Sequence, residues 1–422
     1  QFVESIPIGE GIELARMVKA GRWIFSQGNL ATVHDGGVCA GVGEDRYGRL
    51  FHERPARSEA RWIYQNLGNQ LARAGATLDD LVRIDQYFPD PAFVPPYHDE
   101  RRAVFTTLTP PSTSIIMDGL LTPSAHVCLD AIAMVGAAGT RIPITPPSEV
   151  PAPRSTSGFV PALKAGEFVF VAGQIADSAA KGGLAKEATT NPEFLWDGVE
   201  IKRQASYVLR NLIKTAEAAG SDQEHVVKAQ VYLRSIEDLP AFREVWVQVF
   251  GANGPALSII PATAIALRDG MIEINLLCVE RGVDIDRRPS LAGDASPLAG
   301  EPGVVQALDL TVCSGVMASE GFRLAEVVAK ASRDRYVRSR AYIEMNFIID
   351  RVERQLVAAG QGLHNVTRIT QFHTDLSDFR AMARAWHDRL GTPVPVSAVQ
   401  VPGPLAVAGA SVLVDCWAVA DQ

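Results

Sequence analysis

The sequence predicts an α+β protein built from three similar domains, and three observations lead to that prediction. An alanine-rich amphipathic stretch ends at Gly220, an apolar run from Val226 to Leu233 follows, and a second amphipathic stretch begins near Pro240. The same pattern of helix, glycine, strand and helix surrounds Gly75 and Gly360. The length of 422 residues leaves room for about three domains of ordinary size.

Each unit repeats the same residue types at the same offsets from its glycine. A cationic residue follows at one fixed spacing and an aromatic residue at another: Arg83 and Tyr87, Lys228 and Tyr232, and Arg368 and Phe372. The interval from Gly75 to Gly220 is close to the interval from Gly220 to Gly360, so the period is that of a domain and not of a solenoid repeat. We therefore predict three copies of one domain in a single chain.

The elements of the first unit are expected in a fixed order. Two early strands precede a glycine-rich loop, a long helix, the central strand and a second helix, and a final hairpin closes the unit. The early strands, the loop, the long helix and the two hairpin strands are expected at 14–19, 23–26, 34–48, 58–74, 113–117 and 125–135.

Proline-rich stretches mark the boundaries between the units. Proline cannot continue a helix or a central strand, so 143–157 and 284–302 are predicted to be extended linkers. The three domains are then expected at 1–142, 158–283 and 303–422.

Composition argues against several classes of partner. The formal net charge is −8 and the pI is about 5.6, so no basic surface is expected to neutralise nucleic-acid phosphates or anionic lipids. No apolar run approaches the roughly 18 residues of a membrane span. The cysteines are odd in number and mostly lie in apolar runs, which favours reduced thiols in a cytoplasmic protein: Cys39, Cys128, Cys278, Cys313 and Cys416.

The ends of the early strands and the last strand of the second unit carry a resemblance. The early strands end in glycine turns at Gln27-Gly28, Ala172-Gly173 and Ser314-Gly315, and the last strand reads MIEINLLCV. With the helix closed by Ala-Gly, these features resemble the Rid superfamily, the reactive intermediate deaminases, also called the YjgF family. The resemblance implies chorismate-mutase-like domains that form trimers, with the sheets meeting in a central barrel.

For this chain the resemblance implies a covalent pseudotrimer with sheets inside, helices outside and a small-molecule cleft between each pair of domains. A sheet that carries helices on one face leaves its other face to be covered, and two further sheets can do so. The chain is then expected to be a monomer, or a small homo-oligomer formed through outer surfaces.

The family's deaminases hold the substrate carboxylate with an arginine in a Pro-Ala-Arg-Ser type of motif. The stretches matched to it here lack arginine: Pro111-Ser112-Thr113, Pro261-Ala262-Thr263 and Pro395-Val396-Ser397. A hydroxyl cannot replace the bidentate grip of a guanidinium, so deamination of 2-imino acids by the usual route is in doubt. Ser112, Thr113, Thr263 and Ser397 are instead expected to bind a neutral carbonyl or amide.

The family also places a glutamate on the final strand, where it positions water. Its match is Glu273, and Asn275 shares the same face of the strand as an expected substrate-binding residue. Asp415 is expected at this position in the third unit and Cys128 in the first. The alternatives are a surface Glu273 paired with Arg268, and a buried Cys128 that acts as a small hydrophobe.

Histidines add weaker candidates. His126, Cys128 and Asp130 share one strand face and suggest a thiolate with base and orienting carboxylate, or metal ligands, although neighbours two apart lie about 6 to 7 Å from each other. His373 is expected as a general base or as a residue capping a strand, and His98 is expected in solvent. No metal-ligand or nucleotide motif is present, so neither metal nor cofactor is expected.

Two classes of function follow. The first is a hydrolase or deaminase that acts on a C–N bond of a small imine, enamine or amide, by carboxylate-assisted attack of water in an interdomain cleft. The second is a non-catalytic small-molecule binder or pathway scaffold of the same fold. The missing arginine favours the second class, and the carboxylates Glu273 and Asp415 favour the first.

Overall fold

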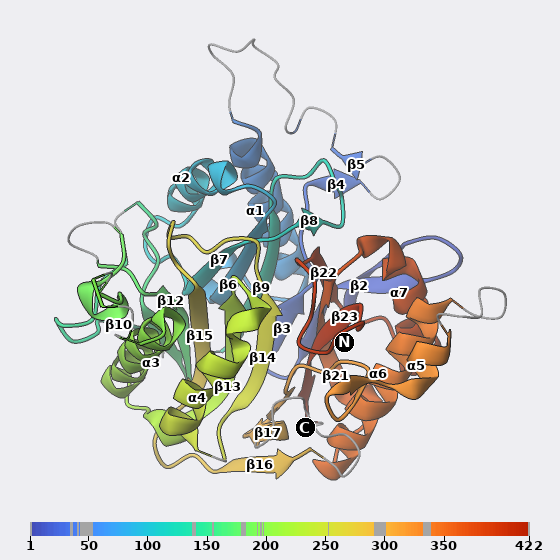
Figure 1. Cartoon of the computed structure of the whole chain (residues 1–422). Helices are drawn as coiled ribbons and strands as arrows, with labels where there is room; N and C mark the ends of the chain where they lie inside the picture. The colour runs from blue at the N-terminus through green and yellow to red at the C-terminus, as the bar shows by residue number, and fades with distance from the viewer. Residues whose placement is uncertain are drawn as a thin grey trace.

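The computed structural model shows a mixed α+β structure with its helices on the outside (Figure 1). The described residues are 2–33, 37–39, 42, 54–136, 141–153, 156–178, 183–191, 193–194, 196, 198–251, 253–290, 301–331 and 339–420. They form three large sheets of six, six and seven strands, which confirms the predicted α+β class. The glycine-rich loop predicted at 34–48 lies largely outside the described residues.

The first sheet has the strand order β1-β2-β3-β9-β6-β7 and carries helices α1 (Pro55–Arg73) and α2 (Val94–Val104). Its strands are β1 (Phe2–Pro7), β2 (Glu13–Ala20), β3 (Trp23–Ser26), β6 (Leu81–Phe88), β7 (Ser112–Ile116) and β9 (Cys128–Met134). β7 runs parallel to β6, and β9 runs antiparallel to β6. The predicted final hairpin is therefore wrong, because β6 lies between its two strands.

The second sheet has the order β10-β11-β12-β15-β13-β14 and carries helices α3 (Glu200–Ala218) and α4 (Leu239–Phe250). Its strands are β10 (Ile142–Ile144), β11 (Ala162–Ala165), β12 (Phe168–Ile175), β13 (Val226–Leu233), β14 (Ala256–Pro261) and β15 (Ile272–Val279). The sequence placed β13 and the start of α4 correctly.

The third sheet has the order β16-β17-β18-β23-β21-β22-β8 and carries helices α6 (Arg340–Ala358) and α7 (Phe379–Leu390). Its strands are β16 (Ile285–Pro289), β17 (Pro302–Ala307), β18 (Leu310–Cys313), β21 (Val366–His373), β22 (Val396–Gln400), β23 (Val412–Val419) and the short β8 (Gly119–Leu120). Smaller elements are β4 (Thr32–Val33), β5 (Gly37–Val38), β19 (Ser319–Glu320), β20 (Arg323–Leu324) and α5 (Glu326–Ala331).

The three sheets repeat one arrangement. In each, a hairpin of early strands lies beside the last strand, and the central strand and a strand parallel to it follow. Gly75, Gly220 and Gly360 have φ angles of 75°, 85° and 75°, and they lie just beyond the ends of α1, α3 and α6. A left-handed backbone favours glycine and closes a helix, as the sequence predicts at these positions.

Both predicted linkers contain a short edge strand. β10 pairs with β11 at the edge of the second sheet, and β16 pairs with β17 at the edge of the third. Proline is tolerated in edge strands because its missing N–H can face away from the ladder. The two stretches are extended as predicted, but parts of them belong to the sheets.

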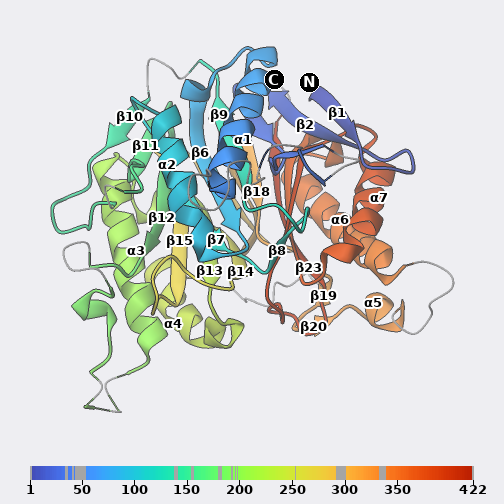
Figure 2. The same cartoon turned by 90° about the horizontal axis from the view of Figure 1, so that it is seen from above.

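Side chains fill the space between the three sheets. One buried cluster contains Trp23, Phe168 and Val312, one from each sheet. A second cluster contains Tyr87, Tyr232 and Phe372. Figure 2 shows the same arrangement from above, with the helices outside. Among the described strands, no pairing closes the sheets into one hydrogen-bonded barrel. None of the described helices is long and apolar enough to cross a membrane.

Candidate active site

A cavity of about 530 Å³ lies between the first and second sheets. Ser112, Ser114 and His98 line it from the first sheet and α2, and Gly173 and Glu273 line it from β12 and β15. Apolar side chains form much of the remaining wall, among them Val94, Ile116, Phe159, Ile175 and Ile265. A mostly apolar cavity with a few convergent polar groups is typical of a small-molecule site.

Glu273 lies at the floor of this cavity because its neighbour on β12 is a glycine. A Cβ added to Gly173 would collide with Glu273 Oε1 and would lie 3.0 Å from Thr113 Cγ2. The absence of a side chain at Gly173 therefore creates the space that the carboxyl occupies. The predicted surface pairing of Glu273 with Arg268 is wrong, since Glu273 is buried.

The carboxyl of Glu273 has few hydrogen-bond partners. In the described part of the chain, Glu273 Oε2 has no hydrogen-bond partner, and the backbone N–H of Ser114 donates to the carboxyl. Burial, together with the negative charge of Asp85, raises the pKa of Glu273 from 4.5 to about 8. Glu273 is therefore largely protonated at neutral pH and can donate a proton.

The opposite wall carries a short chain of polar groups. Ser114 Oγ donates to Gln86 Oε1 at 2.7 Å, and His98 Nε2 lies 3.4 Å from Ser114 Oγ. Burial and the nearby Arg101 and Arg102 lower the pKa of His98 to about 2, so the imidazole is neutral. His98 was expected in solvent, but it lines the cavity because α2 faces the second sheet.

Three predicted substrate-binding residues lie at or beneath this cavity. Ser112 lines it, and its hydroxyl accepts a hydrogen bond from Arg101 Nη1 at 2.9 Å. Thr113 Oγ1 accepts from Asn275 Nδ2 at 3.0 Å, in the buried layer that joins the two sheets. Thr113 and Asn275 therefore hold the walls together below the cavity.

Thr263 does not occupy the position predicted for it. Its side chain is exposed and donates to Asp118 Oδ1 at 2.6 Å. Ser258 on β14 pairs with Gln230 on β13, and Thr113 on β7 pairs with Asp85 on β6. Gln230 and Asp85 occupy the same position in their units. Ser258 is thus the counterpart of Thr113. The motif of the second unit was therefore predicted too far toward the C-terminus.

Asp415 is also displaced from its predicted position. Glu273 lies opposite Tyr232, and the residue opposite Phe372 in the third sheet is Leu413. Asp415 lies two residues further along β23, in the register of Asn275. The third sheet therefore has an apolar side chain where the second has Glu273.

The partners of Asp415 indicate a structural role. Its carboxylate accepts from Lys228 Nζ at 2.9 Å, from Ser258 Oγ at 2.7 Å and from Trp417 Nε1 at 2.7 Å. Burial alone would raise its pKa, but Lys228 and Arg368 outweigh that effect and lower it. The carboxylate is charged and well compensated, so it offers no free base.

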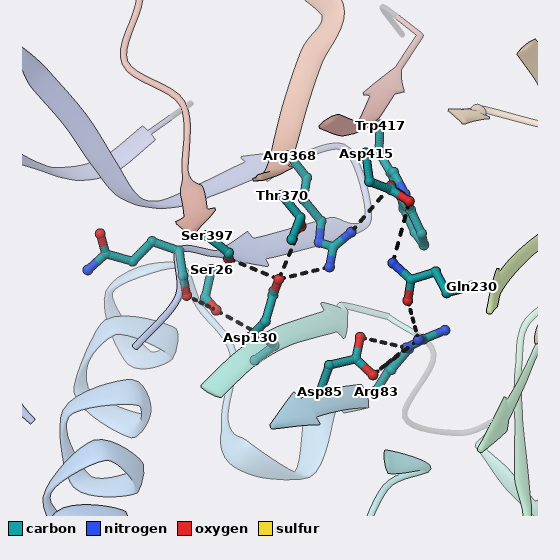
Figure 3. A network of polar contacts seen from close by, with 12 residues as sticks. Ser26, Arg83, Asp85, Asp130, Gln230, Arg368, Thr370, Ser397, Asp415 and Trp417 are labelled. Carbon is teal, nitrogen blue, oxygen red and sulfur yellow. Dashed lines mark hydrogen bonds and ion pairs between the residues drawn. The ribbon is translucent and has the colours of Figure 1, made fainter. Parts of the chain in front are cut away.

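Asp130 and Ser397 belong to the same buried polar layer (Figure 3). Asp130 Oδ2 accepts from Arg368 at 2.8 Å, from Ser397 at 2.9 Å and from Thr370 at 3.4 Å. These groups come from the first and third sheets, and all of them are buried. The hydrogen bonds of Asp130 and Ser397 therefore join the first and third sheets.

The same layer continues to the second sheet. Arg83 contacts Asp85 at 3.0 Å and Gln230 at 2.8 Å, and Gln230 reaches Asp415 at 3.4 Å (Figure 3). The buried cations and carboxylates of the layer balance in number: Arg83, Lys228 and Arg368 against Asp85, Asp130 and Asp415. Buried charges are tolerated when they are paired in this way.

The predicted constellation of His126, Cys128 and Asp130 is not assembled. His126 Nδ1 lies 2.5 Å from Glu59 Oε1 on α1, so its partner lies outside the constellation. Cys128 packs against Gly28, and burial raises the pKa of its thiol. The chemistry of a thiolate nucleophile is therefore absent at this position.

His373 does not reach a described cavity. Its Nε2 lies 2.8 Å from Gln371 Oε1, and burial lowers its pKa to about 3. A neutral, buried imidazole of this kind fits the core better than a general base. Across the described residues, no group of three or more His, Cys, Asp or Glu side chains is placed to hold a metal ion.

The middle of the chain is similar to a known protein family and to several known proteins. The sequence model of the family described as Endoribonuclease L-PSP matches residues 150–280. A RutC family protein of Pyrococcus horikoshii is 32% identical over 126 residues, which are 30% of this chain and 90% of that protein. A 2-iminobutanoate/2-iminopropanoate deaminase of Capra hircus is 26% identical over 32% of this chain and 88% of that protein.

Further similarities come from a plant protein and from solved structures. Reactive Intermediate Deaminase A, chloroplastic, of Arabidopsis thaliana is 29% identical over 30% of this chain and 60% of that protein. The crystal structure of RidA from the Antarctic bacterium Psychrobacter is 26% identical with a TM-score of 0.27, over 33% of this chain and 99% of that chain. A chorismatase crystal structure covers 81% of this chain and 93% of its own, with 12% identity and a TM-score of 0.48.

The family assignment rests on the middle of the chain. The Pyrococcus protein is matched over nearly its whole length at 32% identity. The family match spans 150–280 and so includes β15 with Glu273. Through this segment, the chain belongs to the Rid (RutC, L-PSP) family.

Proposed function

We propose that the protein is a hydrolase or deaminase that cleaves a C–N bond of a small imine, enamine or amide in the cavity between the first and second sheets. The observation that carries this proposal is Glu273, a buried carboxyl with an unpartnered oxygen at the floor of a small-molecule cavity. Perturbed acids in clefts are candidates for proton transfer. The deaminase names of two relatives support C–N chemistry at the level of the family.

Glu273 acts first as an acid in this proposal. For an imine, its carboxyl proton passes to the substrate nitrogen, which leaves a carboxylate and an iminium ion. Water then adds to the iminium carbon, and the carboxylate accepts the proton that the water loses. The carboxyl then gives its proton to the nitrogen of this adduct, the C–N bond breaks as the hydroxyl oxygen forms the carbonyl, and the hydroxyl proton returns to the carboxylate, so that ammonia or an amine leaves. A pKa near 8 suits a group that must give and regain a proton near neutral pH.

The substrate is uncharged at the end that reaches the floor. Thr113 stands where the family motif has arginine, and its hydroxyl is engaged with Asn275. His98 is neutral, and the cavity cation Arg268 is exposed. A carboxylate placed beside Glu273 would therefore meet no compensating charge, whereas a carbonyl or amide would meet hydroxyl groups.

The three units are proposed to be copies of one domain arranged as a pseudotrimer around the central polar layer. The shared strand order and the two central apolar clusters support this proposal. Proposed boundaries remain near the two proline-rich stretches, with their edge strands assigned to the adjoining sheets. Fusion in one chain lets the clefts diverge, so that one keeps an acid while the others lose it.

Glu273→Gln tests the proposal because it keeps the shape of the side chain and removes the proton. We expect turnover to fall by roughly 10² to 10⁴, measured as release of ammonia or amine from a panel of small uncharged imines, enamines and amides. Cys128→Ser is the matched control in another cleft and should change turnover little. Unchanged turnover in Glu273→Gln would refute the assignment of Glu273.

The alternative is a binder without chemistry. It is favoured by the absence of the family arginine, and it predicts that ligand affinity persists while no compound of the panel turns over. Calorimetric titration of the wild-type protein with the panel compounds separates the two outcomes, because binding without turnover would support the binder and overturn the enzyme.

A further inference from the structure

A buried cation lies behind one wall of the cavity between the first and second sheets (the first cavity), and the proposed reaction does not use it. This cation is Arg101 on α2, which is fully buried. Its Nη1 donates to Oγ of the wall residue Ser112 at 2.9 Å, and its Nη2 donates to the backbone carbonyl of Ser157 at 2.5 Å. Arg101 Cζ lies 5.6 Å from the ring centroid of Tyr97 and 5.7 Å from that of Phe159. These contacts hold the guanidinium in one place.

The described partners of Arg101 are all neutral. Besides the contacts above, Nη1 lies 3.3 Å from Gln86 Oε1, and Nε has no hydrogen-bond partner in the described part of the chain. The neighbouring carboxylate of Glu100 contacts Arg57 and Arg61 instead. Taking a cation out of water costs free energy unless an opposite charge or a full set of hydrogen bonds compensates it. The burial of Arg101 therefore indicates a role other than stability.

The other two units show which residue the fold accepts at this place. Trp246 on α4 and Trp386 on α7 occupy the position of Arg101 when the units are aligned on their helix-closing glycines. Both tryptophans are buried. The fold thus accepts an apolar ring here, and the cation is a feature of the first unit.

The polar residues of the cavity wall follow the same division. β7, β14 and β22 pair with their central strands in the same register. The counterparts of Ser112 and Ser114 in the other two units are apolar: Leu257 and Ile259 on β14, and Val396 and Ala398 on β22. Arg101, Ser112 and Ser114 therefore differ together from their counterparts, and they do so on the wall of the cavity that holds Glu273.

The hydrogen bonds of this wall fix the direction of each hydroxyl. Gln86 Nε2 donates to the carbonyl of Ile84 at 3.0 Å, so Gln86 Oε1 is the atom that accepts from Ser114 Oγ at 2.7 Å. The proton of Ser114 is therefore engaged and is not available to a ligand. Ser112 differs, because its oxygen accepts from Arg101 and no described group accepts its proton. Ser112 therefore offers a hydrogen-bond donor to the cavity.

His98 is oriented by the same chain of hydrogen bonds. Because the proton of Ser114 points to Gln86, His98 Nε2 carries the hydrogen in its 3.4 Å contact with Ser114 Oγ. A neutral imidazole has a single N–H, so Nδ1 of His98 is an acceptor. The wall thus combines a donor at Ser112 with an acceptor at His98.

We propose that Arg101 is a positioning residue for substrate recognition: it fixes Ser112 as the donor to a carbonyl oxygen, so that the substrate is an amide and not a simple imine. The positive charge behind Ser112 polarises its O–H bond toward the ligand. An amide presents a carbonyl oxygen to this donor and N–H groups to His98 Nδ1. The inference rests on the proposed use of the cavity as a substrate site, but its test needs no turnover.

A carbon-13 NMR titration of the full chain tests the proposal. The probe is butanamide labelled at its carbonyl carbon, and labelled butanethioamide is its match, because sulfur is a weaker hydrogen-bond acceptor than oxygen. A hydrogen bond to a carbonyl oxygen moves the carbon resonance downfield. We expect the wild-type protein to bind butanamide with a downfield shift and to bind the thioamide more weakly.

Three variants locate the donor. Ser112→Ala should weaken butanamide binding by about fivefold to tenfold, remove the downfield shift and leave thioamide affinity unchanged. Arg101→Met should reduce the shift although Ser112 remains, which a role in packing alone would not do. Ser114→Ala should keep the shift, because its proton is already engaged by Gln86. Ser206→Ala, exposed on α3 and outside the lining of this cavity, controls for the loss of a hydroxyl.

The outcomes separate this proposal from its rivals. Butanoate that binds more tightly than butanamide, and loses this advantage in Arg101→Met, would overturn it by showing that the guanidinium recognises an anion. Equal losses in Ser112→Ala and Ser114→Ala, or no binding of butanamide by the wild-type protein, would also overturn it. If Arg101→Met fails to fold by circular dichroism, Ser112→Ala decides alone.

Glu273→Gln distinguishes the proposal from the proposed reaction. This variant should still bind butanamide with the downfield shift, since the carbonyl is held by Ser112. Normal turnover in Glu273→Gln would refute the reaction and leave the recognition by Ser112 standing. Lost turnover in Glu273→Gln, with wild-type binding in Ser112→Ala, would refute the recognition alone.

Discussion

The buried acid of the first cavity should make the stability of the protein depend on pH in a way that one substitution removes. The pKa of Glu273 rises from 4.5 to about 8 in the folded protein, chiefly through burial. Between these values the unfolded chain releases a proton that the folded protein keeps. The free energy of unfolding must therefore fall as pH rises through this window, because the unfolded state then binds fewer protons.

The size of the effect follows from the shift. Each unit of pKa difference corresponds to about 1.4 kcal/mol, so the loss should be below about 1 kcal/mol at pH 5 and reach about 3 kcal/mol at pH 7. It should level off at about 5 kcal/mol well above pH 8, where both states have lost the proton. These figures are of the order of a third of the total stability of an ordinary domain, so they are measurable.

Glu273→Gln isolates this contribution, because glutamine does not titrate. Urea unfolding of the wild-type protein and of the variant should be measured from pH 5 to pH 9, and the difference between their free energies of unfolding plotted against pH. We expect the variant to gain stability relative to the wild-type protein as pH rises. Glu217→Gln, on the exposed side of α3, controls for the loss of one carboxylate. A difference that stays constant from pH 5 to pH 9 would refute the buried, protonated state of Glu273.

Two further substitutions test the buried ion pair of Asp415 and the space at Gly173. Lys228→Met should lower the free energy of unfolding by about 3 to 5 kcal/mol in urea, because it leaves Asp415 buried without its closest cation, 2.9 Å away; a loss below about 1 kcal/mol would contradict the pairing. Gly173→Ala should reduce turnover almost as far as Glu273→Gln does, because the new Cβ occupies the place of the carboxyl. Gly28→Ala is the control, because it makes the matching collision with Cys128 and should leave turnover largely intact. Equal losses in both variants would point to a general packing defect.

The sequence predicted the α+β class and the catalytic candidate for identifiable reasons. Helix periodicity and the left-handed glycines Gly75, Gly220 and Gly360 mark element boundaries locally, so they are visible without a structure. Glu273 was found because the resemblance to the Rid family implies a glutamate on the final strand, and MIEINLLCV matches that strand; the alternation of strand faces then added Asn275.

The errors also have physical causes. Residues two apart on a strand share a face, so alternation alone could not distinguish Asp415 from Leu413 as the counterpart of Glu273. Only the pairing with Phe372 fixes that register. The same ambiguity displaced the motif on β14, where Ser258 was passed over.

His98 was missed for a different reason. Its position on the polar face of α2 suggested solvent, and within one isolated unit that reading is reasonable. The second sheet packs against this part of the first unit and turns the surface into a cavity wall. Contacts between units are set by tertiary packing, which no local pattern in the sequence records. The short edge strands within the two proline-rich stretches escaped notice in the same way.

In the proposed reaction, Glu273 begins as a proton donor in the cavity between the first and second sheets. Its most direct test is the pH dependence of kcat/KM for release of ammonia by the wild-type protein, measured from pH 5 to pH 10 on a substrate from the uncharged panel. We expect a plateau at low pH and a fall through about pH 8, where the acid is lost, with no such fall in the residual activity of Glu273→Gln. A rate that rises through the same range, or an identical profile in the variant, would contradict it.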